Sequence, residues 1–215
     1  MGAKTWMLVY SDGDVASVLR ESPSLDRARS DEVAKRLFPD DNLEAVGDGS
    51  LYDTCPPKEE AYLGCFPGVT FVAADEFGID RPSQLPGVFL NHDLGSHIYL
   101  HAMHSVVDWF AFAAWESGEL KRSLSLSPDD GVMEDIGERF EFEEPYWSGA
   151  HPAVDDEEED AYPFRFHPLE LGEAALHSLF GYCLEGPVEW LTFEPENVPL
   201  VRFSRAKQKP WWKIW

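Results

Sequence analysis

The amino-acid sequence predicts an α+β fold built on an antiparallel sheet, with a central three-strand meander over about residues 97–127 flanked by helices. Three observations lead to this prediction. Apolar side chains recur with a period of two through the middle of the chain, which is typical of strands. A Ser-Gly pair at residues 117–118 provides a tight hairpin turn between two such stretches. Two other segments carry the three- to four-residue apolar spacing of helices.

The meander begins with residues 97–104. Alternation places His97 and His101 on one face of this strand and His104 on the other. Residues 109–115 are apolar on both faces, as in a central strand that is covered on two sides. Residues 120–127 then alternate leucine or arginine with lysine or serine, which predicts the third strand.

The chain before the meander predicts a strand, a helix and a strand pair. Residues 5–10 are an apolar run and are predicted to form a buried first strand. Residues 26–38 carry an apolar stripe that ends at a proline, which predicts a helix. Residues 40–60 are rich in Asp, Gly and Pro and are expected to be a loop. Residues 61–74 hold one or two strands, broken by a Pro-Gly pair, and residues 82–94 can hold a short helix.

The chain after the meander is more acidic. Residues 128–131 read Pro-Asp-Asp-Gly, a turn signal, and residues 132–147 carry six acidic side chains. Pro168 and Gly186 bracket a predicted helix over residues 169–185, since proline suits the first helical turn and glycine the position past the last.

Domain organisation follows from these segments. Residues 1–186 are predicted to form a single α+β domain, with an acidic linker-like insertion at about residues 154–161. Residues 187–215 are predicted to be a C-terminal extension with a basic and aromatic tail. We expect this tail to dock on the body of the protein or on a neighbouring subunit through five side chains: Lys207, Lys209, Trp211, Trp212 and Trp215.

The charge balance excludes some partners. The chain has 17 basic and 40 acidic residues, a formal net charge of −23. Such a charge opposes binding of nucleic acid or an anionic membrane by the acidic body. It is compatible with a well-solvated surface, a binder of basic proteins, an acidic DNA mimic or adaptation to high salt.

The cysteines and the N-terminus predict a cytoplasmic protein. Three cysteines without a CxxC pair favour free thiols over a disulfide framework. The N-terminus has no long apolar stretch, which predicts no signal peptide. No apolar run approaches the roughly 20 residues that a membrane-spanning helix needs.

The histidines at residues 97, 101 and 104 offer the main alternative to a binding function. On a helix their spacing would align all three for zinc. On a strand only His97 and His101 share a face, and that pair can recruit Asp12 or Asp14 if the first strand is adjacent. The sequence therefore allows a hydrolase or metal-dependent enzyme built from these four residues, beside the simpler expectation of histidines that hydrogen-bond within the sheet.

Recognisable catalytic and nucleotide-binding motifs are missing from the sequence. There is no GxSxG elbow, no GxxxxGK[ST] loop and no GxGxxG turn. The adjacent acids at residues 129–130 and 134–135 can serve acid–base chemistry only if a pocket raises one pKa, and neighbours on a strand point to opposite faces. We therefore predict no cofactor and no bound metal.

Four segments of the chain carry a resemblance to a known family. They read GAKTWMLVYSDGD, YLGCFPGV, YLHAMHSVVDWFAFAAWESGELKRSLSLSPDDGVMEDIGE and FHPLELGEAAL. Over about residues 2–186 the chain resembles a family of actinobacterial proteins that is a domain of unknown function, and this likeness implies no activity or cofactor. The pattern GELKR…DDGV…IGE is also similar to bacterial toxin-immunity proteins.

Taken with the charge, these observations predict a non-catalytic cytoplasmic domain that acts by binding another protein or a second copy of itself.

Overall fold

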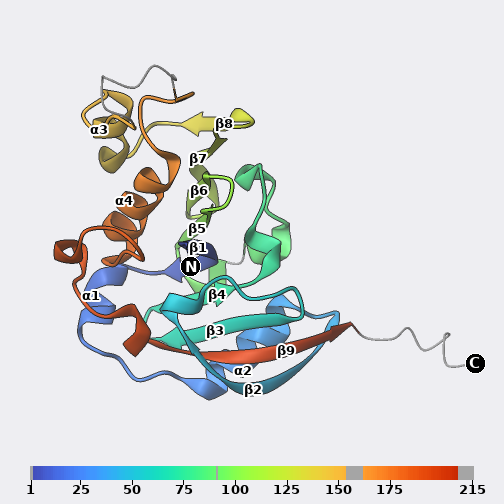
Figure 1. Cartoon of the computed structure of the whole chain (residues 1–215). Helices are drawn as coiled ribbons and strands as arrows, with labels where there is room; N and C mark the ends of the chain where they lie inside the picture. Colours follow the sequence, from blue (N-terminus) through green and yellow to red (C-terminus); the bar gives the residue numbers. More distant parts are fainter. Residues whose placement is uncertain (1, 91, 154–161, 208–215) are drawn as a thin grey trace, which may run out of the picture.

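The computed structural model describes residues 2–90, 92–153 and 162–207. Among these residues the chain forms a nine-stranded antiparallel sheet with the strand order β2-β9-β3-β4-β1-β5-β6-β7-β8 (Figure 1). The strands are β1 (Lys4–Ser11), β2 (Asp41–Ser50), β3 (Glu60–Phe66), β4 (Val69–Ala73), β5 (His97–His104), β6 (Trp109–Glu116), β7 (Glu119–Ser127), β8 (Gly131–Gly137) and β9 (Pro199–Lys207). The α-helices are α1 (Val15–Arg20), α2 (Arg27–Leu37), α3 (Glu144–Trp147) and α4 (Pro168–Phe180). The sheet dominates, so the predicted α+β class describes the fold only in outline.

The predicted meander is confirmed as β5, β6 and β7, which pair in sequence order. Its β6–β7 hairpin turns through Ser117 and Gly118 with φ of 48° and 90°. Positive φ at both positions matches the twist of the flanking strands, which is why a Ser-Gly pair serves there. His97 and His101 share one face of β5 and His104 lies on the other, as the alternation predicted.

The predicted first strand, first long helix and strand pair are also confirmed. They are β1, α2 and the β3–β4 hairpin. Asp26 begins α2, because its carboxylate accepts a hydrogen bond from the Arg29 amide at 2.9 Å.

Three strands, β2, β8 and β9, were missing from the sequence-based prediction. The predicted loop over residues 40–60 is wrong for its first half, which forms β2. This strand lies at an edge of the sheet, pairs only with β9 and exposes most of its side chains, so it lacks the apolar alternation of a half-buried strand. β8, in the acidic stretch after the meander, is the opposite edge strand.

Two helix predictions need correction. Residues 82–94 form three short 3-10 turns, Pro82–Gln84, Gly87–Phe89 and His92–Leu94, in place of one helix. Helix α4 ends at Phe180 because Gly181 adopts a left-handed φ of 81° and caps it, so the end predicted at Gly186 is wrong.

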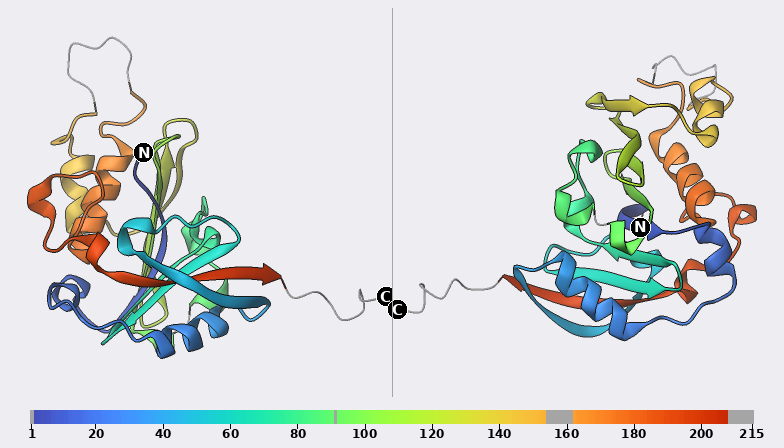
Figure 2. Two further views of the ribbon diagram at one scale, coloured as in Figure 1. Left: turned by 60° about the horizontal axis from the view of Figure 1, so that its bottom comes forward. Right: turned by 180° about the vertical axis from the view of Figure 1, so that it is seen from behind.

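Apolar layers cover both faces of the sheet. On one face α1 and α4 pack over side chains that include Met7, Phe110 and Leu124. On the other face α2 and the segment 75–94 cover a second layer that includes Leu8 and Ala111. In Figure 1, α4 and the segment 75–94 lie on opposite sides of β5, β6 and β7, and Figure 2 shows α2 against the part of the sheet that contains β3 and β9.

The C-terminal part of the described chain joins the sheet. Residues 199–207, which the sequence predicts to lie in a C-terminal extension, form β9 between β2 and β3. The side chain of Arg205 on β9 is only 5% exposed, pairs with Asp41 at 2.7 Å and with Glu76, and lies over the Phe38 ring. The boundary at residue 186 stays a prediction. The predicted linker over residues 154–161 and the tail residues Lys209, Trp211, Trp212 and Trp215 lie outside the described residues. Lys207 is the last residue of β9.

One fully buried ion pair fastens the β7–β8 edge. The guanidinium of Arg122 on β7 donates to both carboxylate oxygens of Glu143 at 2.9 and 2.7 Å, and to Asp135 on β8. Arg122 and Glu143 have no exposed surface. Glu134, the neighbour of Asp135, points to the other face and accepts hydrogen bonds from Ser83. These adjacent acids therefore act separately, as their positions on a strand predicted.

Candidate functional site: an acidic pocket with aromatic walls

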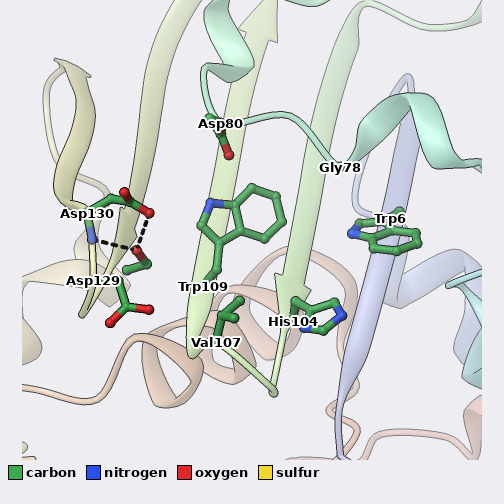
Figure 3. Close-up of a pocket in the computed structure, with 9 residues that line it drawn as sticks. Trp6, Gly78, Asp80, His104, Val107, Trp109, Asp129 and Asp130 are labelled. Atoms are coloured by element: carbon green, nitrogen blue, oxygen red, sulfur yellow. Dashed lines mark hydrogen bonds between the residues drawn. The ribbon is translucent and has the colours of Figure 1, made fainter.

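A pocket of about 300 Å³ opens on one face of the sheet, at the end where β5 turns into β6. We call it the Trp6–Trp109 pocket (Figure 3). Strands β1, β5, β6 and β7 form its floor, and the start of the covering segment 75–94 and the β7–β8 turn form its rim. It is lined by Trp6, Gly78, Asp80, His104, Val107, Trp109, Ser127, Asp129 and Asp130.

Strand register brings the aromatic side chains together. His104 on β5 pairs with Trp109 on β6, and Trp6 on β1 pairs with Ala102, two residues before His104. Directly paired residues point to the same face of a sheet, and so do residues two apart on one strand. Trp6, His104 and Trp109 therefore project from three neighbouring strands into one space.

The two indoles are held in place. The Trp6 ring stacks on the His104 ring, with centroids 6.1 Å apart and planes at 23°. Trp109 is 8% exposed, and its Nε1 donates to the Ser125 hydroxyl at 3.2 Å. Because that hydrogen bond fixes the indole, Trp109 presents a prepared apolar wall to the pocket.

The rim is acidic. Asp129 and Asp130 come from the exposed β7–β8 turn, and Asp80 comes from the covering segment. The Ser127 hydroxyl donates to the Asp130 carboxylate at 3.1 Å, and the Asp130 amide donates back to the same hydroxyl oxygen at 3.1 Å. Figure 3 shows the Trp109 indole between these turn aspartates and the His104 and Trp6 rings, with Asp80 approaching from the covering segment. Among the lining residues described, none is a lysine or arginine.

His104 does not offset this charge near neutral pH. Burial, and then the positive charge of Lys4, lower the pKa of His104 below its ordinary value of 6.5. Its Nδ1 accepts a hydrogen bond from the Val106 amide at 3.3 Å. A neutral imidazole beside two indoles and three aspartates leaves a pocket suited to a cation, because aromatic faces and carboxylates both attract positive charge.

His101, one of the sequence-predicted site residues, lies inside the protein. It has no exposed surface; its Nδ1 lies 2.7 Å from the Thr5 hydroxyl and its Nε2 2.9 Å from the Gly172 carbonyl oxygen. Both ring nitrogens are therefore occupied within the fold. Burial lowers the pKa of His101 to about 4. The ring acts as a hydrogen-bonded link between β1, β5 and α4.

The other three predicted residues lie near the opposite end of β5. His97 is half-buried, stacks on Tyr99 and lies 3.8 Å from Glu116. Asp12 accepts a hydrogen bond from the Ser96 amide at 3.0 Å, and Asp14 caps α1 through Ser17. His97 and His101 are four positions apart along the strand, which corresponds to about 13 Å. The structure thus places Asp12 near His97, through Ser96, and leaves His101 apart from both.

No metal-ligand constellation occurs in the described part of the chain. Within residues 2–90, 92–153 and 162–207, no group of three or more His, Cys, Asp or Glu side chains is arranged to hold a metal ion. The cysteines Cys55, Cys65 and Cys183 are all free, in agreement with the predicted thiols. Burial raises the pKa of Cys65, as befits a structural thiol.

Sequence reasoning missed the Trp6–Trp109 pocket, although its parts were visible. The sequence predicts a turn at residues 128–131 and places Trp6 and Trp109 in predicted strands, but no local pattern shows that these segments meet. The position of Asp80 at the pocket rim could not be predicted from the sequence, because it depends on how the segment 75–94 packs over the sheet.

A comparison with known protein families identifies one whose model matches the chain. Residues 5–203 match the model of a family described as a family of unknown function, DUF6928. The chain belongs to this family. The likeness predicted from the four sequence segments is thereby confirmed, and the DUF6928 match extends past residue 186 through most of β9. Every residue that lines the pocket lies within the matched range. The actinobacterial origin stays a prediction.

In two further comparisons, no curated protein and no solved structure matches the chain. As for membranes, none of the helices that the structure describes combines the length and the apolar character needed to cross one.

Proposed function

We propose that this protein is a non-catalytic binding domain whose Trp6–Trp109 pocket takes a lysine or arginine side chain from a basic segment of a partner protein. The observation that carries the proposal is the composition of the pocket: three aspartates, two indoles and a neutral imidazole, without a basic side chain among its described lining residues. Each part favours a cation, and nothing among these residues neutralises the carboxylates in advance.

Each expected contribution to the binding free energy is modest. A cation over an indole face contributes about 0.5–2 kcal/mol, depending on how far it is desolvated. An ion pair at an exposed rim contributes about 0.2–1 kcal/mol. One pocket therefore supports weak and selective recognition of a single side chain. The net charge of −23 adds long-range attraction for a basic partner, which raises the rate of encounter at low salt.

The alternatives from the sequence receive less support. A hydrolase or metal-dependent enzyme would need His97, His101, Asp12 and Asp14 in one cleft, whereas His101 is enclosed in the core. An acidic DNA mimic or a toxin-immunity-like role stays a prediction, as does a cytoplasmic location. We favour binding because the pocket joins aromatic and acidic groups around a space that a side chain can enter.

The test is an NMR titration that observes the indole N–H signals, assigned with the variants Trp6→Phe and Trp109→Phe. The probe is a short peptide with one central arginine and otherwise uncharged residues, and its matched control carries citrulline, which keeps the shape and lacks the charge. We expect the arginine peptide to shift the Trp6 and Trp109 signals and the citrulline peptide to leave them unchanged. Equal shifts with both peptides, or shifts confined to other tryptophans, would contradict the proposal.

A further inference from the structure

A second pocket lies close to the first, beyond the β5–β6 turn. It has a volume of about 520 Å³ and is bounded by Ala3, by the first half of α4 and by residues 185–190. Its carboxylates are Glu170, Glu173 and Glu185, and again no lysine or arginine is found among its described lining residues. We call it the Glu170–Glu185 pocket.

The β5–β6 turn separates the two pockets and touches both. Val107 of the turn lines the Trp6–Trp109 pocket. Its neighbour Asp108 lies 3.5 Å from Nε2 of His167, which lines the Glu170–Glu185 pocket. Ser105, at the start of the turn, donates its amide to the carbonyl oxygen of Ala3 at 3.2 Å, and Ala3 also lines the second pocket. The pockets are therefore neighbours across a single turn.

The two central residues of the turn are apolar and exposed. Val106 is 74% exposed and Val107 is 47% exposed. Single exposed valines are ordinary on a protein surface. Val106 and Val107, adjacent to each other and between two acidic pockets, form a small apolar surface that an apolar side chain of a partner can cover.

The second pocket repeats the chemistry of the first. Tyr146 stacks on His151 with ring centroids 4.6 Å apart, and Trp190 stacks on His177 at 5.1 Å. Both carboxylate oxygens of Glu173 are occupied by the amides of Leu184 and Glu185, at 2.7 and 3.1 Å. Glu170 and Glu185 are exposed, so their carboxylates are the ones that a ligand can reach.

We propose that one basic segment of a partner protein crosses the β5–β6 turn, placing a cationic side chain in each pocket and an apolar side chain over Val106. The inference rests on the proposed function of the Trp6–Trp109 pocket and adds a second anchor to it. Two weak sites joined by one short segment bind far more tightly than either alone, because the second contact forms at a high effective concentration. The partner is thereby defined as a segment with two spaced basic residues and an apolar residue between them.

The experiment measures the affinity of peptides with two arginines separated by spacers of increasing length, with a single-arginine peptide as reference. At fixed ionic strength we expect the best two-arginine peptide to bind at least tenfold more tightly than the reference. We also expect affinity to pass through a maximum as the spacer lengthens, since a spacer that cannot span the turn gains nothing. A leucine in the spacer should tighten binding further, and Val106→Ser should remove that gain.

Matched variants separate the second pocket from general charge attraction. Glu170→Gln with Glu185→Gln should reduce the two-arginine peptide to the affinity of the reference. Glu21→Gln with Glu44→Gln removes the same charge from exposed positions that line neither pocket, and should leave the advantage in place. Equal behaviour of the two double variants, or affinity independent of spacer length, would overturn the inference. Shifts of Trp6 and Trp109 by a single arginine would then still support the proposed function, whereas their absence would refute that function itself.

Discussion

Acidification should destabilise this fold through His101 in particular. The ring is enclosed, and its Nε2 faces the Gly172 carbonyl oxygen, so this nitrogen carries the proton and Nδ1 accepts from the Thr5 hydroxyl. Protonating Nδ1 would place an uncompensated charge in the core and break the contact with the Thr5 hydroxyl proton. Burial accordingly lowers the pKa of His101 to about 4 in the folded protein.

The sign and size of the effect follow from linkage. The unfolded chain has a histidine pKa of about 6.5 and binds the proton more readily than the folded protein, so stability falls as the pH decreases from about 6.5 towards 4. The difference between these two pKa values corresponds to about 3 kcal/mol, which is a large part of a typical free energy of unfolding of about 5–15 kcal/mol.

The assay is urea unfolding of the wild type and of His101→Gln at several pH values between 7.5 and 4.5. Glutamine stays neutral and keeps one donor and one acceptor, and every other titrating group is common to both proteins. We expect the free energy of unfolding of the wild type to fall by about 2–3 kcal/mol more than that of the variant over this range. Parallel curves would refute the reasoning, since they would mean that His101 binds its proton equally well in the folded and unfolded chains.

Three other predictions concern the ion pair, the pocket and the tail. Arg122→Met should lower the free energy of unfolding by about 3–5 kcal/mol, because it leaves Glu143 buried without its partner; urea unfolding that detects less than about 1 kcal/mol would contradict this. The affinity for the arginine peptide should fall as the pH decreases below the ordinary histidine pKa, because a protonated His104, whose pKa is lowered, repels the bound cation. In His104→Gln the affinity should depend less on pH. A pH profile identical to that of the wild type would contradict this prediction. Deleting residues 208–215 spares β9 and should lower the melting temperature or change the elution volume in sizing, if the tail tryptophans dock as the sequence predicts. A deletion that alters neither property would contradict docking.

The central part of the sheet was predictable because its side chains report their surroundings locally. β5 to β7 alternate or are apolar on both faces, and the Ser-Gly turn fixes how two of them connect. β2 gave no such signal, because an exposed edge strand buries little and is held by backbone pairing with β9, more than 140 residues later. The position of β9 between β2 and β3 is a long-range property that no local pattern contains.

The candidate site illustrates the same limit. The sequence predicted correctly which face of β5 each histidine occupies, but that face is covered by α4, so His101 became a core residue. His104, on the other face, reached the Trp6–Trp109 pocket because the covering segment leaves the end of the strand open. The spacing of the histidines along the strand thus predicted the face to which each side chain points. Whether that face is buried or exposed depends on how distant segments pack over it.

The affinity of the arginine peptide for Asp80→Asn combined with Asp129→Asn tests the central claim most directly. Asp130 is left intact because Ser127 holds it. The control, Asp40→Asn with Glu21→Gln, removes the same charge at exposed positions outside the pocket. Two lost ion pairs of up to about 1 kcal/mol each predict a roughly tenfold weaker affinity in the pocket variant. The control should stay within about twofold of the wild type at the same ionic strength. An equal loss in both variants would show that net charge, and not the Trp6–Trp109 pocket, attracts the cation.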